Sequence, residues 1–131
     1  AYHLIPSLSA LENVMFPAEL RGDARAREKA QALLAKAGVA ARGANFPHQL
    51  SGGEKQRVAI CRALINEPAI VFADEPTGDL DTASGQAVLD LMLALQRERA
   101  TALVMVTHSA ETAERADRVI TLVDGRIRPS P

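Results

Sequence analysis

The sequence predicts an α/β protein whose N-terminal half is helical and whose C-terminal half contains a parallel sheet. Two short runs, residues 69–73 and 103–106, are apolar throughout, which is typical of strands buried on both faces. The amphipathic stretch between them has the length of a crossover helix, so strand, helix and strand form one right-handed unit with parallel strands. The 131 residues are 47% hydrophobic and 24% charged, which indicates a globular domain and excludes a disordered chain.

Charge and cysteine content narrow the function classes. Lys and Arg number 15 and Asp and Glu 16, and the net charge of -1 gives no overall attraction to nucleic acid or anionic lipid. The single cysteine, Cys61, excludes an intrachain disulfide and a cysteine-rich zinc site, and we interpret it as a buried thiol. No apolar run reaches the roughly 20 residues of a membrane-spanning helix, and we expect a cytoplasmic protein. Because the first residue is Ala1 and not methionine, we expect the chain to start inside a longer protein.

The helical half begins with a capping box. Ser9 with Glu12 three residues later marks the start of a first helix. Pro17 is expected to break or kink this helix. A second, amphipathic helix is expected from about Asp23, and Gly38 is its C-terminal stop.

A second capping box opens the next helix. Residues 39–50 lack periodicity and predict a loop. Ser51 with Glu54 then starts a helix that ends before Pro68, ahead of the first apolar strand. Asp81 is the expected N-cap of the crossover helix.

The C-terminal residues predict a short helix and then a hairpin. The helix is expected over residues 110–116. Two apolar segments, 119–123 and 126–128, flank Asp124-Gly125, a strong two-residue turn signal.

Candidate chemistry lies where the two buried strands end. Asp74 and Glu75 end the first strand, and His108 ends the second. In a parallel pair these side chains reach the same sheet edge, the one where open parallel sheets place their ligands. The first carboxylate then serves Mg²⁺ on a nucleotide, the second activates water, and a neutral histidine holds a phosphate or the water. The alternative is two solvated acids and a structural histidine.

The segment Ser51-Gly52-Gly53 has a physical interpretation of its own. Glycines allow close approach of a ligand to the backbone, and a helix N-terminus directs free N–H groups and partial positive charge at an anion. An ordinary capped helix is the alternative interpretation of the same three residues.

Taken together, these segments resemble a known family in order and spacing. The similarity is to the signature motif, Walker B, D-loop and H-loop of ABC transporter ATPases, and it covers essentially the whole chain. The residues that carry it are Leu50 to Glu54 with Lys55-Gln56-Arg57, then Asp74 to Asp81, then Thr107-His108-Ser109. Leu11-Glu12-Asn13-Val14 and Glu75 to Asp79 look most like the lipoprotein-release and macrolide-export subgroup.

The resemblance implies roles for individual residues and cofactors. ATP and Mg²⁺ are the implied cofactors, and two subunits sandwich two nucleotides. Ser51, Gly52, Gly53 and Glu54 would face the γ-phosphate of ATP held mainly by the second subunit. Asp74 would serve Mg²⁺, Glu75 would be the general base, His108 would contact the γ-phosphate, and Asp79 would belong to the D-loop at the dimer interface.

Two departures from the family pattern stand out. Glu54 replaces a frequent glutamine and adds a negative charge near the nucleotide. No Gly-x-x-x-x-Gly-Lys-Ser/Thr occurs, so the Walker A loop is missing and we expect the chain alone to be inactive.

The implied fold is a P-loop NTPase-like core lacking its Walker A part, preceded by an ABC-type helical subdomain. The expected domains are residues 1–66, helical with the signature motif, and residues 67–131, the C-terminal part of a RecA-like core.

The leading functional hypothesis is part of the ATPase subunit of an ABC transporter, which exports or extracts a substrate through a membrane permease. Such a subunit is peripheral on the inner face of the cell membrane, with a permease and a second ATPase subunit as partners and no nucleic acid. Alternatives are a non-transport ABC ATPase, disfavoured because residues 1–49 hold no long heptad run, and a non-catalytic interaction module.

The same resemblance predicts an incomplete sheet. In the family, one further strand lies between the His108 strand and residues 119–123, and another flanks the Asp74 strand. Without them the apolar strands have free edges, so we expect self-association, or a rearranged sheet with residues 119–123 beside the His108 strand.

Overall fold

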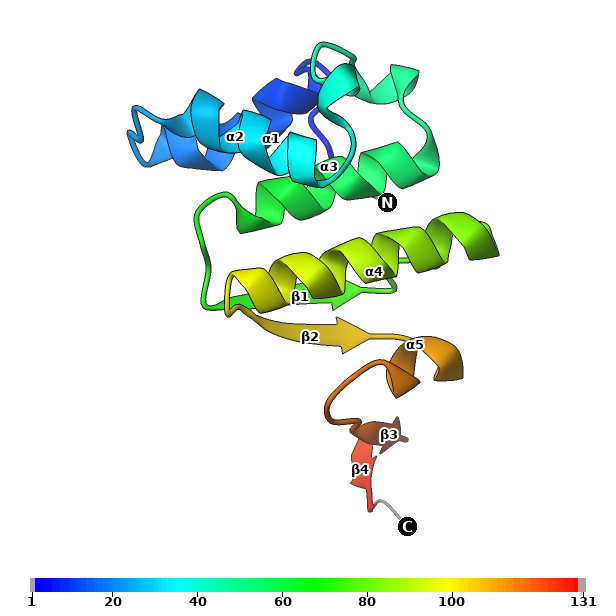
Figure 1. Ribbon diagram of the computed structural model, residues 1–131. Coiled ribbons are helices and arrows are strands. Elements are labelled where there is room, and N and C mark those ends of the chain that lie inside the picture. Colours follow the sequence, from blue (N-terminus) through cyan, green and yellow to red (C-terminus); the bar gives the residue numbers. More distant parts are fainter. Residues whose placement is uncertain (1, 130–131) are drawn as a thin grey trace.

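The computed structural model describes residues 2–129 (Figure 1). Its helices and 3-10 turns are α1 (Ala10–Leu20), α2 (Ala26–Lys36), η1 (Ala40–Arg42), η2 (Pro47–Gln49), α3 (Gly52–Leu64), α4 (Thr82–Glu98) and α5 (Ala110–Glu114). Its strands are β1 (Ile70–Asp74), β2 (Ala102–Val106), β3 (Thr121–Val123) and β4 (Arg126–Arg128). Helices α1, α2 and α3 pack together, α4 lies between α3 and the β1–β2 pair, and the β3–β4 hairpin comes after α5 at the C-terminal end.

The first capping box forms as expected. The Glu12 backbone N–H donates to Ser9 Oγ (3.2 Å), and the Ser9 N–H donates to Glu12 Oε1 (3.0 Å). The expected break at Pro17 is wrong, because α1 continues to Leu20. One missing N–H does not end a helix whose flanking residues Val14 and Ala18 are fully buried.

The end of α2 confirms the role of Gly38. This residue has a φ of 73°, and its N–H donates to the Ala35 carbonyl oxygen at 3.1 Å. The next N–H, from Val39, reaches back to the Leu34 carbonyl oxygen at 2.9 Å, which completes a Schellman cap. The expected loop over residues 39–50 contains the two short turns η1 and η2.

Helix α3 joins two hydrophobic clusters. Val58, Cys61 and Ile65 recur at helical spacing and pack in the cluster formed with α1 and α2. On another face, Ile60 and Leu64 pack in the cluster formed with α4 and the inner face of the sheet. Helix α3 therefore contributes to the packing of both halves of the molecule.

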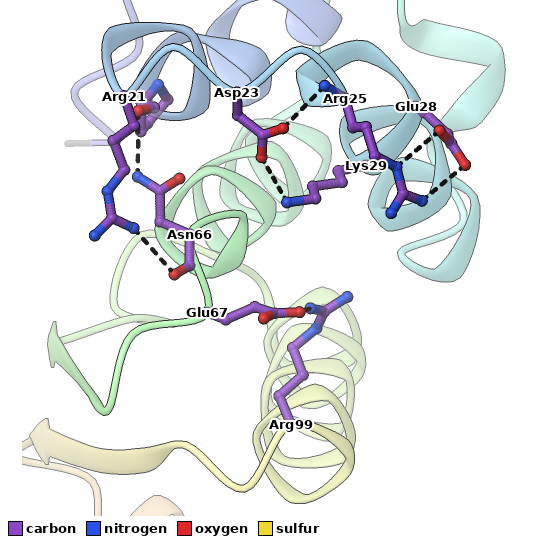
Figure 2. Close-up of polar contacts among 9 residues, drawn as sticks. Arg21, Asp23, Arg25, Glu28, Lys29, Asn66, Glu67 and Arg99 are labelled. Atoms are coloured by element: carbon purple, nitrogen blue, oxygen red, sulfur yellow. Dashed lines mark hydrogen bonds and ion pairs between the residues drawn. The ribbon is translucent and has the colours of Figure 1, made fainter.

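Polar contacts reinforce the ends of these helices (Figure 2). Asp23 accepts from the Lys29 ammonium at 2.5 Å and from the Arg25 backbone N–H at 2.9 Å, which fixes the start of α2. Glu67, after α3, lies 3.7 Å from Arg99 at the end of α4. Both pairs remain partly open to solvent, which screens their charges and limits the stability that each contributes.

The predicted crossover unit is confirmed. β1 and β2 pair in parallel with Ile70 opposite Ala102, and α4 covers one face of the pair. Burial on both faces, however, is wrong. The second face leaves Ile70, Phe72, Val104 and Val106 between 47% and 77% exposed. An apolar run predicts a strand that another element covers on each face. Within residues 2–129, however, no element lies over this second face of the sheet.

The predicted hairpin also forms. β3 and β4 pair antiparallel, and both turn residues, Asp124 and Gly125, have positive φ (49° and 72°) as a two-residue hairpin turn requires. The hairpin is a sheet of its own, so the rearranged sheet with residues 119–123 beside β2 is wrong.

Self-association stays a prediction. In the described part of the chain β1 and β2 each have one unpaired edge, and the exposed face carries Phe72 at 77% accessibility. Uncharged apolar edges of this kind pair with other chains. Light scattering at micromolar concentration is expected to give a dimer or larger species, and Phe72→Lys is expected to shift it toward monomer. A wild-type monomer at that concentration contradicts the prediction.

Cys61 is buried in the helical cluster, and its burial raises the pKa of the thiol to about 12. This agrees with the buried thiol expected from the sequence. None of the helices within residues 2–129 is long and apolar enough to cross a membrane.

Candidate functional site

The glycine-rich start of α3 is shaped by its own capping box. The Glu54 N–H donates to Ser51 Oγ (3.2 Å), and the Ser51 N–H donates to Glu54 Oε1 (2.9 Å). Gly52 lies close to its neighbours, because a Cβ there would be 3.1 Å from Leu80 Cδ2 and 3.2 Å from the Tyr2 hydroxyl oxygen. A side chain at this position would therefore require these two side-chain ends to shift by a few tenths of an ångström.

The charge that Glu54 adds is neutralised within the chain. Its Oε2 lies 2.9 Å from Arg42 Nε, at the end of η1. The Ser51 backbone N–H is the largest cause, with Arg42 contributing, of a Glu54 pKa below its usual range. Arg42 compensates for the departure from the family pattern at this position. The sequence does not reveal the Arg42–Glu54 pair, because Arg42 lies 12 residues before Glu54 in a segment that is predicted only as a loop.

The two strand-end carboxylates have different surroundings. Asp74 ends β1 opposite Val106, is exposed, and its side chain has no hydrogen-bond or ion-pair partner among the described residues. Glu75 is half-buried, and its backbone N–H donates to the Val106 carbonyl oxygen (2.8 Å). Glu75 also has a φ of 45°, a left-handed conformation that is uncommon for a residue other than glycine and is typical of functional sites.

Glu75 and His108 come together, as the strand-end argument predicts. The His108 backbone N–H donates to Glu75 Oε1 at 2.7 Å, and the imidazole Nε2 lies 3.6 Å from the same oxygen. The His108 side chain is 97% exposed. Thr107 Oγ1 lies 3.5 Å from Glu75 Oε2, which leaves that oxygen only weakly engaged. A carboxylate held in this way has one firmly oriented oxygen and one that is only weakly engaged.

The segment between β1 and α4 lies against the start of α3. Gln56 Nε2 donates to the Pro76 carbonyl oxygen at 2.7 Å, and Leu80 packs beside Gly52. Partial burial and the charge of Asp79 raise the pKa of Tyr2, so Tyr2 and Asp79 are neighbours at this point. Asp79 itself is exposed.

These elements end on one side of the molecule. In Figure 1 the N-terminal ends of α3 and α4 and the C-terminal ends of β1 and β2 lie on the same side. Helix N-termini favour anions and strand-end carboxylates favour a cation, so this edge suits a phosphate with a bound metal. Within the described residues no three metal-ligating side chains cluster, so Asp74 would supply one ligand and phosphate or water the others.

Gln56, Tyr2 and Thr107 are site residues that the sequence motifs did not single out for a role. Gln56 and Pro76 are 20 residues apart, and Tyr2 precedes Gly52 by 50. Contacts across such separations depend on how whole helices are placed. Local patterns carry no signal for them.

Comparison with known proteins gives a consistent result. A family model described as ABC transporter matches residues 1–78. The lipoprotein-releasing system ATP-binding protein LolD of Legionella pneumophila is 53% identical over 128 residues, 96% of this chain and 56% of that protein. The macrolide export ATP-binding/permease protein MacB of Rhodospirillum rubrum is 50% identical over 137 residues, 99% of this chain and 21% of that protein.

The structural comparison agrees with the sequence comparison. The ATP-binding cassette MJ0796, solved as a dimer in a post-hydrolysis state bound to ADP and Pi, superposes with a TM-score of 0.80 at 41% identity. The match covers 98% of this chain and 58% of that one. The chain thus spans little more than half the length of LolD and of MJ0796.

Proposed function

Because this chain belongs to the ABC transporter family, we propose that it is part of an ATP-hydrolysing subunit that powers export or extraction of a substrate through a separate membrane permease. The observation that carries the proposal is the juxtaposition of Glu75 and His108 at the sheet edge, on the side of the molecule where the glycine N-terminus of α3 also lies. Two of its relatives, LolD and MacB, are named for lipoprotein release and macrolide export. Their names favour extraction or export of such substrates over import.

We assign the reaction to residues at this edge. Glu75 accepts the proton of the attacking water through its less engaged Oε2, while the His108 N–H holds Oε1 in place. The exposed His108 ring contacts the γ-phosphate of the ATP at this edge. Ser51 and the N–H groups of Gly52 and Gly53 contact the γ-phosphate of ATP held mainly by a second subunit; the Ser51 N–H itself is already bonded to Glu54 Oε1. Asp74 binds the Mg²⁺ that accompanies ATP, which its exposed and unpartnered carboxylate suits.

The chain has two parts, and the proposed subunit has two partners. Residues 1–66 form a helical subdomain and residues 67–131 part of the nucleotide-binding core, which lacks a Walker A loop within this chain. Glu54 lies at the same helix start, where its ion pair with Arg42 offsets the negative charge that it brings near the nucleotide. Asp79 lies in a segment at the interface with a second ATPase subunit, which supplies the main phosphate cradle. The subunit lies in the cytoplasm, against the inner face of the membrane and in contact with the permease.

Nucleotide binding tests the proposal. We expect this chain to bind Mg-ATP more weakly than micromolar and to hydrolyse none above background, since it has the accessory groups and no phosphate-binding loop. A longer protein that carries a Walker A loop before Ala1 is expected to bind and hydrolyse ATP. Calorimetry and a coupled phosphate assay on both proteins measure the difference.

Three outcomes would contradict these expectations. Micromolar binding by this chain, or turnover that Glu75→Gln abolishes, means that the site is complete without the loop. A longer protein that binds no nucleotide favours the non-catalytic interaction module, for which Phe16 and the 73% exposed Leu20 of α1 offer an apolar surface.

A further inference from the structure

Gln56 forms a hydrogen bond whose position suggests a role beyond packing. It lies in the second turn of α3, five residues after the N-cap Ser51, and its Nε2 donates to the Pro76 carbonyl oxygen at 2.7 Å. Pro76 comes directly after Asp74 and Glu75 and is buried. The bond therefore ties the helix that begins with the glycine motif to the backbone that carries the two carboxylates.

The backbone on the far side of this bond is strained. Glu75 has a φ of 45°, and non-glycine residues persist in this region only where surrounding contacts hold them. On one side the Glu75 N–H is fixed to Val106, and the Gly78 N–H returns to the Glu75 carbonyl oxygen at 3.0 Å. The Gln56 bond fixes the next carbonyl along, at Pro76.

A groove of about 420 Å³ opens between α3 and β1, and Gln56, Asp74 and Pro76 all line it. Because the groove leaves space beside the segment, loss of the hydrogen bond frees the Pro76 peptide to rotate. That peptide is the central one of the turn closed by the Gly78 N–H on the Glu75 carbonyl oxygen, so its rotation would disturb the turn that holds the Glu75 backbone, and with it the carboxylate bonded to the His108 N–H.

We propose that Gln56 is a positioning residue that holds Glu75 in its strained conformation and couples that conformation to the glycine N-terminus of α3. The expected effect on catalysis rests on the proposed function, because it requires that Glu75 be the general base. Its structural content, the coupling of residues 51–56 to residues 75–78, is independent of ATP hydrolysis and is measured on this chain directly.

Amide hydrogen exchange and amide proton shifts on Gln56→Leu form the first experiment. The leucine keeps the size and helix preference of glutamine and removes the donor. We expect exchange at the Gly78 and His108 amides to rise tenfold or more, and the His108 amide proton to move upfield as its bond to the Glu75 carboxylate weakens. Amides of α1 and α2 are expected to stay within twofold of wild type.

Matched variants separate positioning from a general loss of stability. Gln31→Leu makes the same change on an exposed residue of α2 and is expected to leave the Gly78 and His108 amides unchanged. Gln56→Glu keeps the side-chain shape but cannot donate when ionised, so it is expected to reproduce the Gln56→Leu effect even if the leucine variant folds poorly. If both Gln56 variants leave these two amides within twofold of wild type, the proposal is wrong.

A second measurement uses the longer, ATP-hydrolysing protein. There Gln56→Leu is expected to lower kcat about tenfold with KM changed less than twofold, because it misplaces the base without removing a binding group. A raised KM at unchanged kcat overturns the positioning role. If that protein hydrolyses no ATP, the proposed function fails, while the exchange result on this chain still decides the coupling.

Discussion

Glu75→Gln in the longer ATP-binding protein is expected to lower ATP turnover by about 100-fold or more while nucleotide binding persists, since a positioned general base typically contributes about 10²–10⁴-fold. The substitution preserves the geometry, because the glutamine amide oxygen can accept the His108 N–H in place of Oε1. It removes the ability to take a proton. Dimers with bound ATP are expected to accumulate, and steady-state turnover with size-exclusion chromatography in ATP measures both effects.

Glu114→Gln is the matched control for this prediction. Glu114 ends α5, is exposed, and its side chain makes no hydrogen bond or ion pair among the described residues, so the same chemical change there is expected to leave turnover within twofold. If Glu75→Gln also stays within a few-fold of wild type, Glu75 is not the base. The assignment of the strand-end carboxylates would then have to be revised.

Elements defined by local chemistry were predictable from the sequence. The capping boxes at Ser9 and Ser51 form because a serine hydroxyl and a glutamate carboxylate lie three residues apart. Both partners belong to the first turn of one helix, so the contact needs no other element. The approach of Glu75 to His108 was expected from one topological rule, that carboxyl ends of parallel strands share an edge. Assignments of this kind need no knowledge of how distant elements pack.

The remaining contacts depend on the placement of whole elements. Apolarity of β1 predicted burial on both faces, but the second face is exposed because burial depends on an element being there to cover it. The Gln56 bond to Pro76 and the Arg42 pair with Glu54 depend on how α3 lies against the sheet and against η1. Neither contact has a spacing that a sequence pattern encodes.

Asn13 is the residue for which we expect the largest effect on stability. It is fully buried in α1, and its side chain makes four hydrogen bonds with the segment that precedes the helix. Oδ1 accepts from the Ile5 N–H (2.8 Å), and the two N–H groups of Nδ2 are shared among the carbonyl oxygens of Ile5 (3.1 Å), Leu8 (3.0 Å) and Ser9 (3.0 Å). The side chain thus replaces the backbone partners that an irregular segment lacks.

Asn13→Ala is expected to lower the free energy of unfolding by about 2–4 kcal/mol, because buried polar groups left unsatisfied cost about 1–3 kcal/mol each. The Ile5 N–H and the Leu8 carbonyl oxygen lose a partner, whereas the Ser9 carbonyl oxygen keeps the Asn13 backbone N–H at 2.8 Å. Since domains are stable by only about 5–15 kcal/mol, this is a large fraction of the total. Urea unfolding monitored by circular dichroism, at a concentration where light scattering shows one species, measures the change.

Two further variants test the cause of that loss. Asn66→Ala removes one side-chain bond, to the Pro17 carbonyl oxygen at 3.2 Å, from a half-buried site and is expected to cost about 1 kcal/mol or less. Asn13→Asp keeps the acceptor for the Ile5 N–H but has no N–H groups for Leu8 and Ile5, and it buries a carboxylate, so it is expected to destabilise at least as much as alanine near pH 7. A loss for Asn13→Ala no larger than that for Asn66→Ala would mean that water or backbone rearrangement satisfies the segment over residues 5–9, and that this network does not hold the start of α1.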